Sequence, residues 1–200
     1  MADELTQVHL TGAQIRALAH PLRLRLLGQL RLDGPATATG LAAALGTNTG
    51  ATSYHLRQLA EAGLVTEEER PASGRQRWWR AAHDVSSWRR SYYEGDPDAT
   101  AAAEWMEAQQ VSRFAELARN WRRALPDEPP RWRDTGEISD YLLHLDADQT
   151  HALMRELDEV IERHRRAGRD TPAPDARPIA LYLAALPRTG AESEPQERAP

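Results

Sequence analysis

Glycine and proline residues divide residues 13 to 83 into short segments. Their positions limit the possible folds more than any other feature of the sequence. Gly34-Pro35, Gly46 and Gly63 each follow a run in which apolar residues recur at three and four positions, as on one face of an amphipathic helix. Because glycine and proline seldom continue a helix, these stops predict a series of short helices. Residues 13 to 63 therefore fold back on themselves rather than form one long helix.

The side chains ahead of these runs predict where the helices start. A side-chain oxygen can accept a hydrogen bond from the free N–H groups of a first helical turn, and proline suits the first helical position. Residues of these types at the expected starts are Thr11, Pro21, Thr39 and Asn48. In the last of the four helices, from Thr49 to about Ala62, the apolar spacing predicts that Ala51, Leu59 and either His55 or Leu56 face inward.

Two strands are expected after this helix. Leu64 to Glu69 and Gln76 to Ala81 are joined by Pro71-Ala72-Ser73-Gly74, the turn residues of a hairpin with a loop longer than two residues. Trp78 and Trp79 are neighbours on the second strand, so their side chains point to opposite faces and one of them packs in the core. Short helices and a hairpin can close a small core, and residues 13 to 83 are predicted to form one domain.

The rest of the chain predicts a long helix and a second small unit. Residues 97 to 125 carry an apolar stripe at helical spacing. Glu137 to Leu145 and Ile179 to Leu186 are expected to be strands on either side of an amphipathic helix from Asp148 to Ala167. The predicted fold is α+β, mainly α, with a flexible N-terminus (1–12), the N-terminal domain (13–83), a helical linker and dimerisation region (84–126), a strand-helix-strand module (135–187) and a disordered tail (188–200).

Charge is distributed unevenly along the chain. The formal net charge is −5, yet residues 13 to 83 hold nine Arg against five acids, whereas residues 96 to 200 hold 14 Arg against 21 acids. Only the N-terminal domain is therefore suited to a polyanion. The sequence has no Cys, which excludes disulfides, thiolate metal sites and Cys nucleophiles. No membrane span or export signal is recognisable, so a cytoplasmic protein is expected.

The N-terminal domain resembles a known family of DNA-binding proteins. Short helices followed by a hairpin with Arg at its tip are the order of a winged helix-turn-helix. Residues 17–27 (ALAHPLRLRLL), 41–46 (LAAALG) and 53–65 (SYHLRQLAEAGLV) are similar to the opening, the positioning helix and the recognition helix of ArsR-type bacterial transcriptional regulators. The resemblance implies a homodimer that binds double-stranded DNA and represses transcription by occluding a promoter. Tyr54 departs from it, because many relatives carry Arg there.

The fourth helix and the hairpin supply the residues expected to contact DNA. Short polar side chains let a helix backbone approach the major groove, Arg can bond guanine or phosphate, and a cationic hairpin tip suits phosphates or a narrow minor groove. The resemblance adds His55, from the family's Ser-x-His-Leu pattern. The expected DNA-binding residues are Thr49, Gly50, Thr52, Ser53, Tyr54, His55, Arg57, Arg75 and Arg77. The alternative is a protein-interaction or assembly module whose winged helix no longer binds DNA.

Three aromatic residues mark the helix predicted at residues 97 to 125. Trp105, Phe114 and Trp121 can belong to the core of one chain, to a dimer seam or to a ligand pocket. We assign them to dimerisation, because regulators of this type pair so that two recognition helices meet successive major grooves about 34 Å apart. The identity of any small-molecule effector does not follow from these residues.

Motifs of catalysis and of metal binding are missing from the sequence. It contains no Gly-rich phosphate loop, no Gly-x-Ser-x-Gly elbow and no His-Glu-x-x-His motif. No two of the seven His residues are three or four positions apart, and only Asp148 with His151 and Glu162 with His164 remain as partial ligand sets. We therefore expect neither an enzyme nor a bound cofactor or metal.

Overall fold

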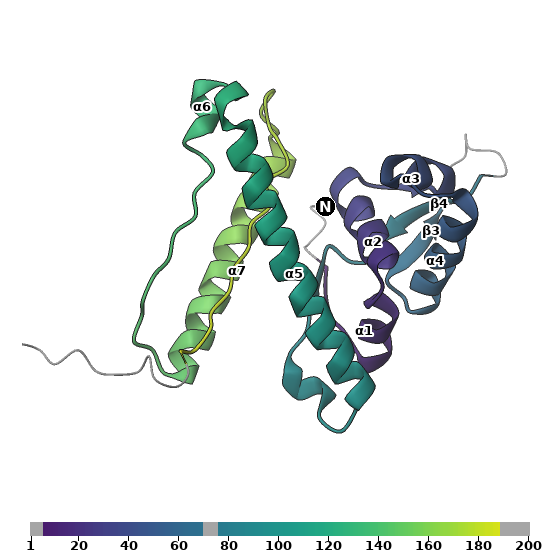
Figure 1. Cartoon of the computed structure of the whole chain (residues 1–200), viewed down its shortest axis with the longest axis horizontal. Helices are drawn as coiled ribbons and strands as arrows, with labels where there is room; N and C mark the ends of the chain where they lie inside the picture. Colours follow the sequence, from purple (N-terminus) through teal and green to yellow (C-terminus); the bar gives the residue numbers. More distant parts are fainter. Residues whose placement is uncertain (1–5, 70–75, 189–200) are drawn as a thin grey trace, which may run out of the picture. The chain divides into compact units, whose positions relative to one another are not determined.

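The computed structural model describes residues 6–69 and 76–188, and the chain divides into two compact units, residues 1–126 and 127–200. The elements of the first unit are β1 (Gln7–His9), α1 (Gly12–Leu18), α2 (Pro21–Asp33), β2 (Ala36–Thr37), α3 (Ala38–Leu45), α4 (Thr49–Glu61), β3 (Val65–Glu68), β4 (Trp78–Ala81), β5 (Val85–Ser87), the 3₁₀ helix η1 (Arg90–Tyr93) and α5 (Pro97–Ala124) (Figure 1). The helix α5 thus belongs to the same unit as the N-terminal helices, although the sequence predicted a domain boundary at residue 83.

Three of the four helices start where the sequence predicts. Thr11 and Asn48 cap α1 and α4 through their side chains, and Pro21 is the first residue of α2. The predicted start of α3 is wrong by two residues. Thr37 rather than Thr39 is the cap, because the Thr37 hydroxyl accepts a hydrogen bond from a backbone N–H of the first turn at 3.1 Å.

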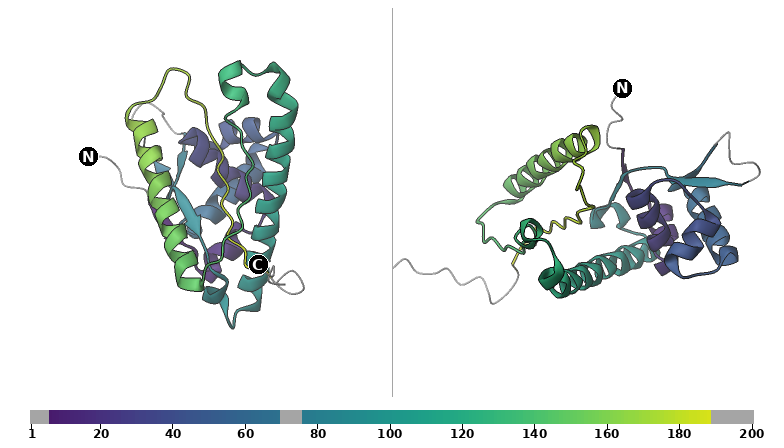
Figure 2. Two further views of the ribbon diagram at one scale, coloured as in Figure 1. Left: turned by 90° about the vertical axis from the view of Figure 1, so that its left-hand side faces the viewer. Right: turned by 90° about the horizontal axis from the view of Figure 1, so that it is seen from above.

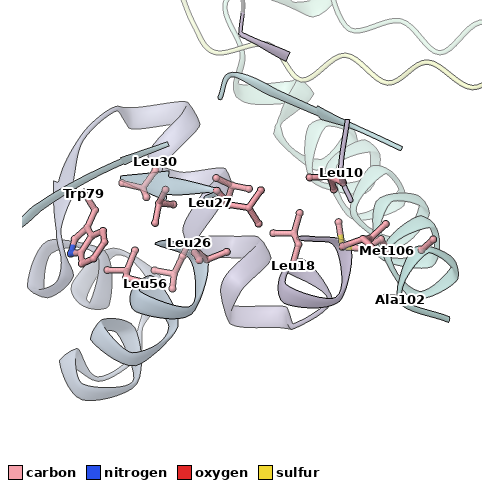
Figure 3. Close-up of a cluster of buried hydrophobic side chains, with 14 of the residues drawn as sticks. Leu10, Leu18, Leu26, Leu27, Leu30, Leu56, Trp79, Ala102 and Met106 are labelled. Carbon is pink, nitrogen blue, oxygen red and sulfur yellow. The ribbon is translucent and has the colours of Figure 1, made fainter. Parts of the chain in front are cut away.

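The core of the first unit runs from the hairpin through α2 to α5 (Figure 3). Trp79 of β4 lies at one end, Met106 of α5 lies at the other, and the leucines of α2 lie between them. Full burial of one such leucine is worth about 1.5–3 kcal/mol. Trp79 is therefore the tryptophan of the pair that packs inward, as the alternation of strand residues requires.

The predicted hairpin is present as part of a three-stranded antiparallel sheet. β4 is the middle strand, flanked by β3 and by the two-residue strand β2, with Glu67 opposite Trp79 and Thr66 opposite Arg80. The predicted turn at Pro71 to Gly74 lies outside the described residues. β2 was not predicted, because two residues are too few to show a strand period.

The residues before α1 differ from the prediction. β1 runs parallel to β5, with Val8 opposite Ser86, and the Tyr93 hydroxyl donates a hydrogen bond of 2.8 Å to the carbonyl of Leu10. Residues 7 to 12 are therefore part of the fold rather than a flexible lead-in, and β5 replaces part of the helix expected after residue 84. Strands of three residues that pair across a long stretch of chain leave no local signal in the sequence.

α1 lies against α5 with little space between the two helices. A Cβ atom added at Gly12 would come 3.0 Å from Asp96 Oδ2 and 3.4 Å from the Cβ of Ala99. The Arg16 guanidinium forms an ion pair with Asp96 at 2.5 Å beside this contact. Small residues thus allow the first turns of the two helices to pack closely.

The second unit is built around one helix. After η2 (Leu125–Asp127) come the short α6 (Pro130–Arg133) and the long α7 (Ala147–Asp170), which matches the helix predicted at 148–167. The predicted strands at 137–145 and 179–186 are not present, and both segments run without helix or strand (Figure 2). A strand exists only where a second strand accepts its hydrogen bonds, and the single chain provides no such ladder for these described residues.

Candidate nucleic-acid interface

α4 has one buried face and one exposed face. Its buried residues are Thr52, Leu56 and Leu59, spaced four and three residues apart as one side of a helix requires. The exposed residues of α4 that were predicted to contact DNA are Thr49, Gly50, Tyr54 and Arg57, and Ser53 is half-buried at their edge. Most of the predicted contact residues on α4 therefore share one accessible surface.

Thr52 does not belong to this surface, so its predicted contact with DNA is corrected. Its side chain is 0% exposed, and its hydroxyl has no hydrogen-bond partner among the described residues. Thr52 occupies the inward position that the sequence predicted for Ala51, which is only half-buried. A shift of one position around the helix explains the error, since alanine and threonine are both small enough for this part of the core.

The exposed face of α4 borders a cleft of about 490 Å³. Three parts of the chain contribute its walls: Thr37 with the start of α3, one face of α4 from Thr49 to Arg57, and β4 with the residues before it. The lining residues are Thr37, Ala38, Thr39, Thr49, Ser53, Arg57, Gln76, Arg77 and Trp79. The cleft thus brings together Arg57 of the helix and Arg77 of the hairpin. The sequence did not predict that Thr37, Thr39 and Gln76 line the cleft. A threonine ahead of a helix does, however, indicate a residue at the helix start.

Two arginines give the cleft its charge. The Arg57 side chain donates from Nε to the carbonyl of Ser53 at 3.3 Å and remains exposed. Arg77 forms an exposed ion pair of 3.1 Å with Glu67 on the neighbouring strand. Hydroxyl groups, guanidinium groups and a helix start are the groups that bind phosphate oxygens in DNA complexes.

His55 lies on the side of α4 that faces α2. Its ring is 4.3 Å from the ring of His20 and 5.1 Å from that of Tyr54, measured between centroids. Burial lowers the pKa of His55, and the nearby His20 and Arg23 lower it further. His55 does not line the cleft, so its predicted contact with DNA stays a prediction.

The remaining predicted site residues lie apart from α4. Arg75 is outside the described residues. On α5, Trp105 packs partly against the core of the first unit, while Phe114 is exposed and Trp121 is half-buried. Trp105 is therefore shared between the core and the surface, and Phe114 is the exposed member of the three aromatic residues predicted for dimerisation.

The described residues contain neither a candidate metal site nor a candidate membrane span. No group of three or more His, Cys, Asp or Glu side chains is arranged to hold a metal ion in the part of the chain that the structure describes. No helix in that part has both the length and the apolar character to cross a membrane.

Comparison with known proteins agrees with this geometry. Residues 18–68 match a family described as a helix-turn-helix domain. The chain is also 49% identical over 54 residues to the HTH-type transcriptional regulator NmtR of Mycobacterium tuberculosis, a match that covers 27% of this chain and 44% of NmtR. Residues 18–68 therefore form a helix-turn-helix domain. Because the chain spans less than half of the length of NmtR, the likeness concerns the helix-turn-helix domain and not the whole of either protein.

Solved structures of other proteins are similar to part of the chain. A crystal structure described as a possible transcriptional regulator for arsenical resistance is 30% identical, covers 52% of this chain and 94% of its own, and gives a TM-score of 0.32. The homodimeric winged helix-turn-helix DNA-binding domain of a possible ArsR-family regulator from Mycobacterium bovis is 24% identical. The match covers 50% of this chain and 77% of that one, with a TM-score of 0.33. Reduced HlyU from Vibrio cholerae is 23% identical, and the match covers 48% of this chain and 84% of that one, with a TM-score of 0.31.

Proposed function

We propose that the protein is a transcriptional regulator that binds double-stranded DNA in a sequence-specific manner. The observation that carries this function is the cleft, in which Thr49, Ser53 and Arg57 of α4 meet Arg77 of the hairpin. The exposed α4 surface enters the major groove, where Arg57 bonds guanine or phosphate, and Arg77 contacts the flanking backbone. Arg75, at the predicted hairpin tip, adds a second cation to this contact.

The protein acts as a homodimer and represses transcription by occluding a promoter. Val111 and Phe114 are exposed on α5, beyond the turns that pack on the core, and they supply apolar surface for a second copy. A twofold axis would place two α4 helices in successive major grooves about 34 Å apart. Like regulators of this type in general, the protein works in the cytoplasm and catalyses no reaction.

Selection of bound sequences from random duplex DNA tests the proposed function. We expect enrichment of a palindrome whose half-sites are about 10 base pairs apart, centre to centre. Enrichment of a single half-site would contradict the homodimer. No enrichment of any sequence would contradict the specific binding of DNA.

Replacement of Arg57 tests the cleft directly. Arg57→Ala should weaken duplex binding by roughly 1–3 kcal/mol, whereas Arg89→Ala, which removes an exposed arginine outside the cleft, should leave binding nearly unchanged. Contacts to four to six phosphates per dimer would give a logarithmic salt slope of about −4 to −5. Equal binding by the Arg57 variant and the unmodified protein would favour an interaction module instead.

A further inference from the structure

The second unit has no closed core. Among residues 127–188, all of which the structure describes, no side chain is buried. Ten large apolar side chains in two of its segments are between 39% and 83% exposed: Ile138, Tyr141, Leu142, Leu143, Leu145, Ile179, Leu181, Tyr182, Leu183 and Leu186. Ordering a chain costs conformational entropy that buried apolar surface must offset. A unit of this composition is therefore incomplete as a single copy.

α7 has an apolar face next to a well-paired polar face. On the polar face, Glu162 forms ion pairs with Arg165 at 2.8 Å and Arg166 at 2.6 Å. The hydrogen bond from Arg165 is the largest of the effects that lower the pKa of Glu162 to about 2. The apolar residues at positions 153, 157, 160 and 161 follow helical spacing, and Val160 is still 38% exposed. Leu153, Leu157 and Ile161 are half-buried, so the apolar face of α7 is only partly covered in the single chain.

The two exposed segments have the residue pattern of strands. In each, bulky apolar residues occupy alternate positions, at 141, 143 and 145 in the first and at 179, 181 and 183 in the second. Both run without helix or strand, one before and one after α7 in the sequence (Figure 2). Residues 179–186 contain no charged side chain, and residues 138–145 contain only Asp140 and His144 as titratable groups besides Tyr141. Such segments can pack on one another without bringing like charges together.

We propose that residues 138–145 and 179–186 are strands of a sheet that forms between two copies of this chain, with the apolar face of α7 packed against it. A pair of strands within one chain is marginal in water, whereas two copies supply four strands. A strand edge is also complementary to its own twofold copy, so no other partner is needed. The inference rests on the homodimer of the proposed function and goes beyond it, because it concerns the second unit and requires no DNA.

The exposed surface is large enough for such an interface. Ten side chains that each lose roughly 100 Å² would exceed the about 800 Å² that a stable interface buries on each partner. All ten residues lie within the second unit. Coverage by another part of the same chain is the competing outcome, and the experiments below separate the two.

Hydrogen–deuterium exchange of the full chain, read by mass spectrometry without DNA, tests the sheet. We expect the backbone amides of both segments to exchange at least about tenfold more slowly than in an unfolded peptide. Exchange at the unfolded rate, in samples that sedimentation shows to be dimeric, would overturn the proposal. This measurement needs no variant, so it does not depend on whether a substituted chain folds.

Distances between spin labels test whether the sheet is shared by two copies. Because the sequence has no Cys, Ala180→Cys provides one label in each chain. Four adjacent strands span about 15 Å, so the two labels should lie within roughly 30 Å of each other. Protected segments without dipolar coupling between labels would show that the strands pair inside one chain, and this result would overturn the proposal.

A double substitution completes the test. Leu143→Asp together with Leu181→Asp should abolish the protection of both segments and weaken self-association at least about tenfold. The matched control is Leu32→Asp, which places the same charge on a 61% exposed leucine of α2 and should change neither. Protection that persists in the double variant would contradict the proposal. None of these readouts uses DNA, so their failure is distinct from failure of the proposed regulator function.

Discussion

The imidazole rings of His20 and His55 lie 4.3 Å apart, with an angle of 35° between their planes. The contact joins the start of α2 to the middle of α4. His20 caps α2, since its Nδ1 accepts a hydrogen bond of 3.1 Å from the N–H of Leu22. Nδ1 of His55 has no hydrogen-bond partner among the described residues. Two neutral rings can stack in this way, whereas two protonated rings would repel each other.

Acidification should therefore destabilise the N-terminal domain. Burial lowers the pKa of both His20 and His55 from the ordinary value of 6.5, with smaller effects from Arg23 on both and from His20 on His55. The unfolded chain then binds more protons than the folded chain below about pH 6.5, so the free energy of unfolding decreases as the pH falls through that region. Urea unfolding at pH 7.5 and 5.5 measures this decrease. The decrease should be smaller for His55→Gln, and an identical pH dependence in the variant would contradict the assignment.

Thr52→Val should stabilise the protein without affecting DNA binding. The buried hydroxyl has no partner among the described residues, and its replacement by a methyl group should raise the free energy of unfolding by about 1 kcal/mol. Thermal and urea unfolding measure the stability, and titration of a duplex measures binding. Ser53→Ala is the matched change on the cleft side and should weaken binding with little effect on stability. Weaker binding by Thr52→Val alone would show that Thr52 becomes accessible in the complex.

Arg31→Ala should destabilise the first unit. Arg31 donates from Nε to the carbonyl of His83 at 3.0 Å and from Nη2 to the hydroxyl of Ser86 at 2.8 Å, and so ties α2 to the region of β5. Burial lowers its pKa to about 10, which leaves the side chain charged at neutral pH. Loss of these bonds should reduce the free energy of unfolding by roughly 1.5–3 kcal/mol, whereas Arg89→Ala at an exposed position should change it by less than about 0.5 kcal/mol. Equal effects of the two substitutions would argue against this role.

Glu67→Gln should strengthen binding to DNA. The substitution releases Arg77 from its ion pair and removes a negative charge close to the cleft. Since both side chains are exposed, the ion pair contributes little to stability, and the folded domain should be unaffected. Duplex affinity should rise a few-fold, and the salt slope should become steeper by at most about 1. Glu69→Gln makes the same change of charge two residues further along the chain, and an equal gain in both variants would assign the effect to net charge rather than to Arg77.

Local signals in the sequence predicted much of the N-terminal domain. The caps at Thr11 and Asn48, Pro21 at the first position of α2 and the alternation at Trp78 and Trp79 all appear in the structure as expected. Each of these signals acts within a few residues of the chain. The cap of α3 was missed because two threonines two positions apart offer the same side-chain oxygen.

Features that depend on distant residues were predicted less well. β1 and β5 are three residues each and pair across most of the domain, so neither has a pattern of its own. Thr52 was placed outside because a threonine is usually polar surface, and only the packing of α4 on its neighbours shows otherwise. The cleft combines three separate segments, which explains why Thr37 and Gln76 were not predicted with Arg57 and Arg77. The segments at 138–145 and 179–186 have a strand pattern, yet one chain does not supply the hydrogen bonds that strands need.

The close fit between Gly12 and the first turns of α5 affects how binding could be controlled. α5 has 28 residues, and at about 1.5 Å per residue it is roughly 42 Å long. Its first turns pack against α1 beside Gly12, whereas no residue of α5 after Met106 is buried. A bound molecule that moved the distal half of α5 would therefore act on the first unit through the contact between α5 and α1.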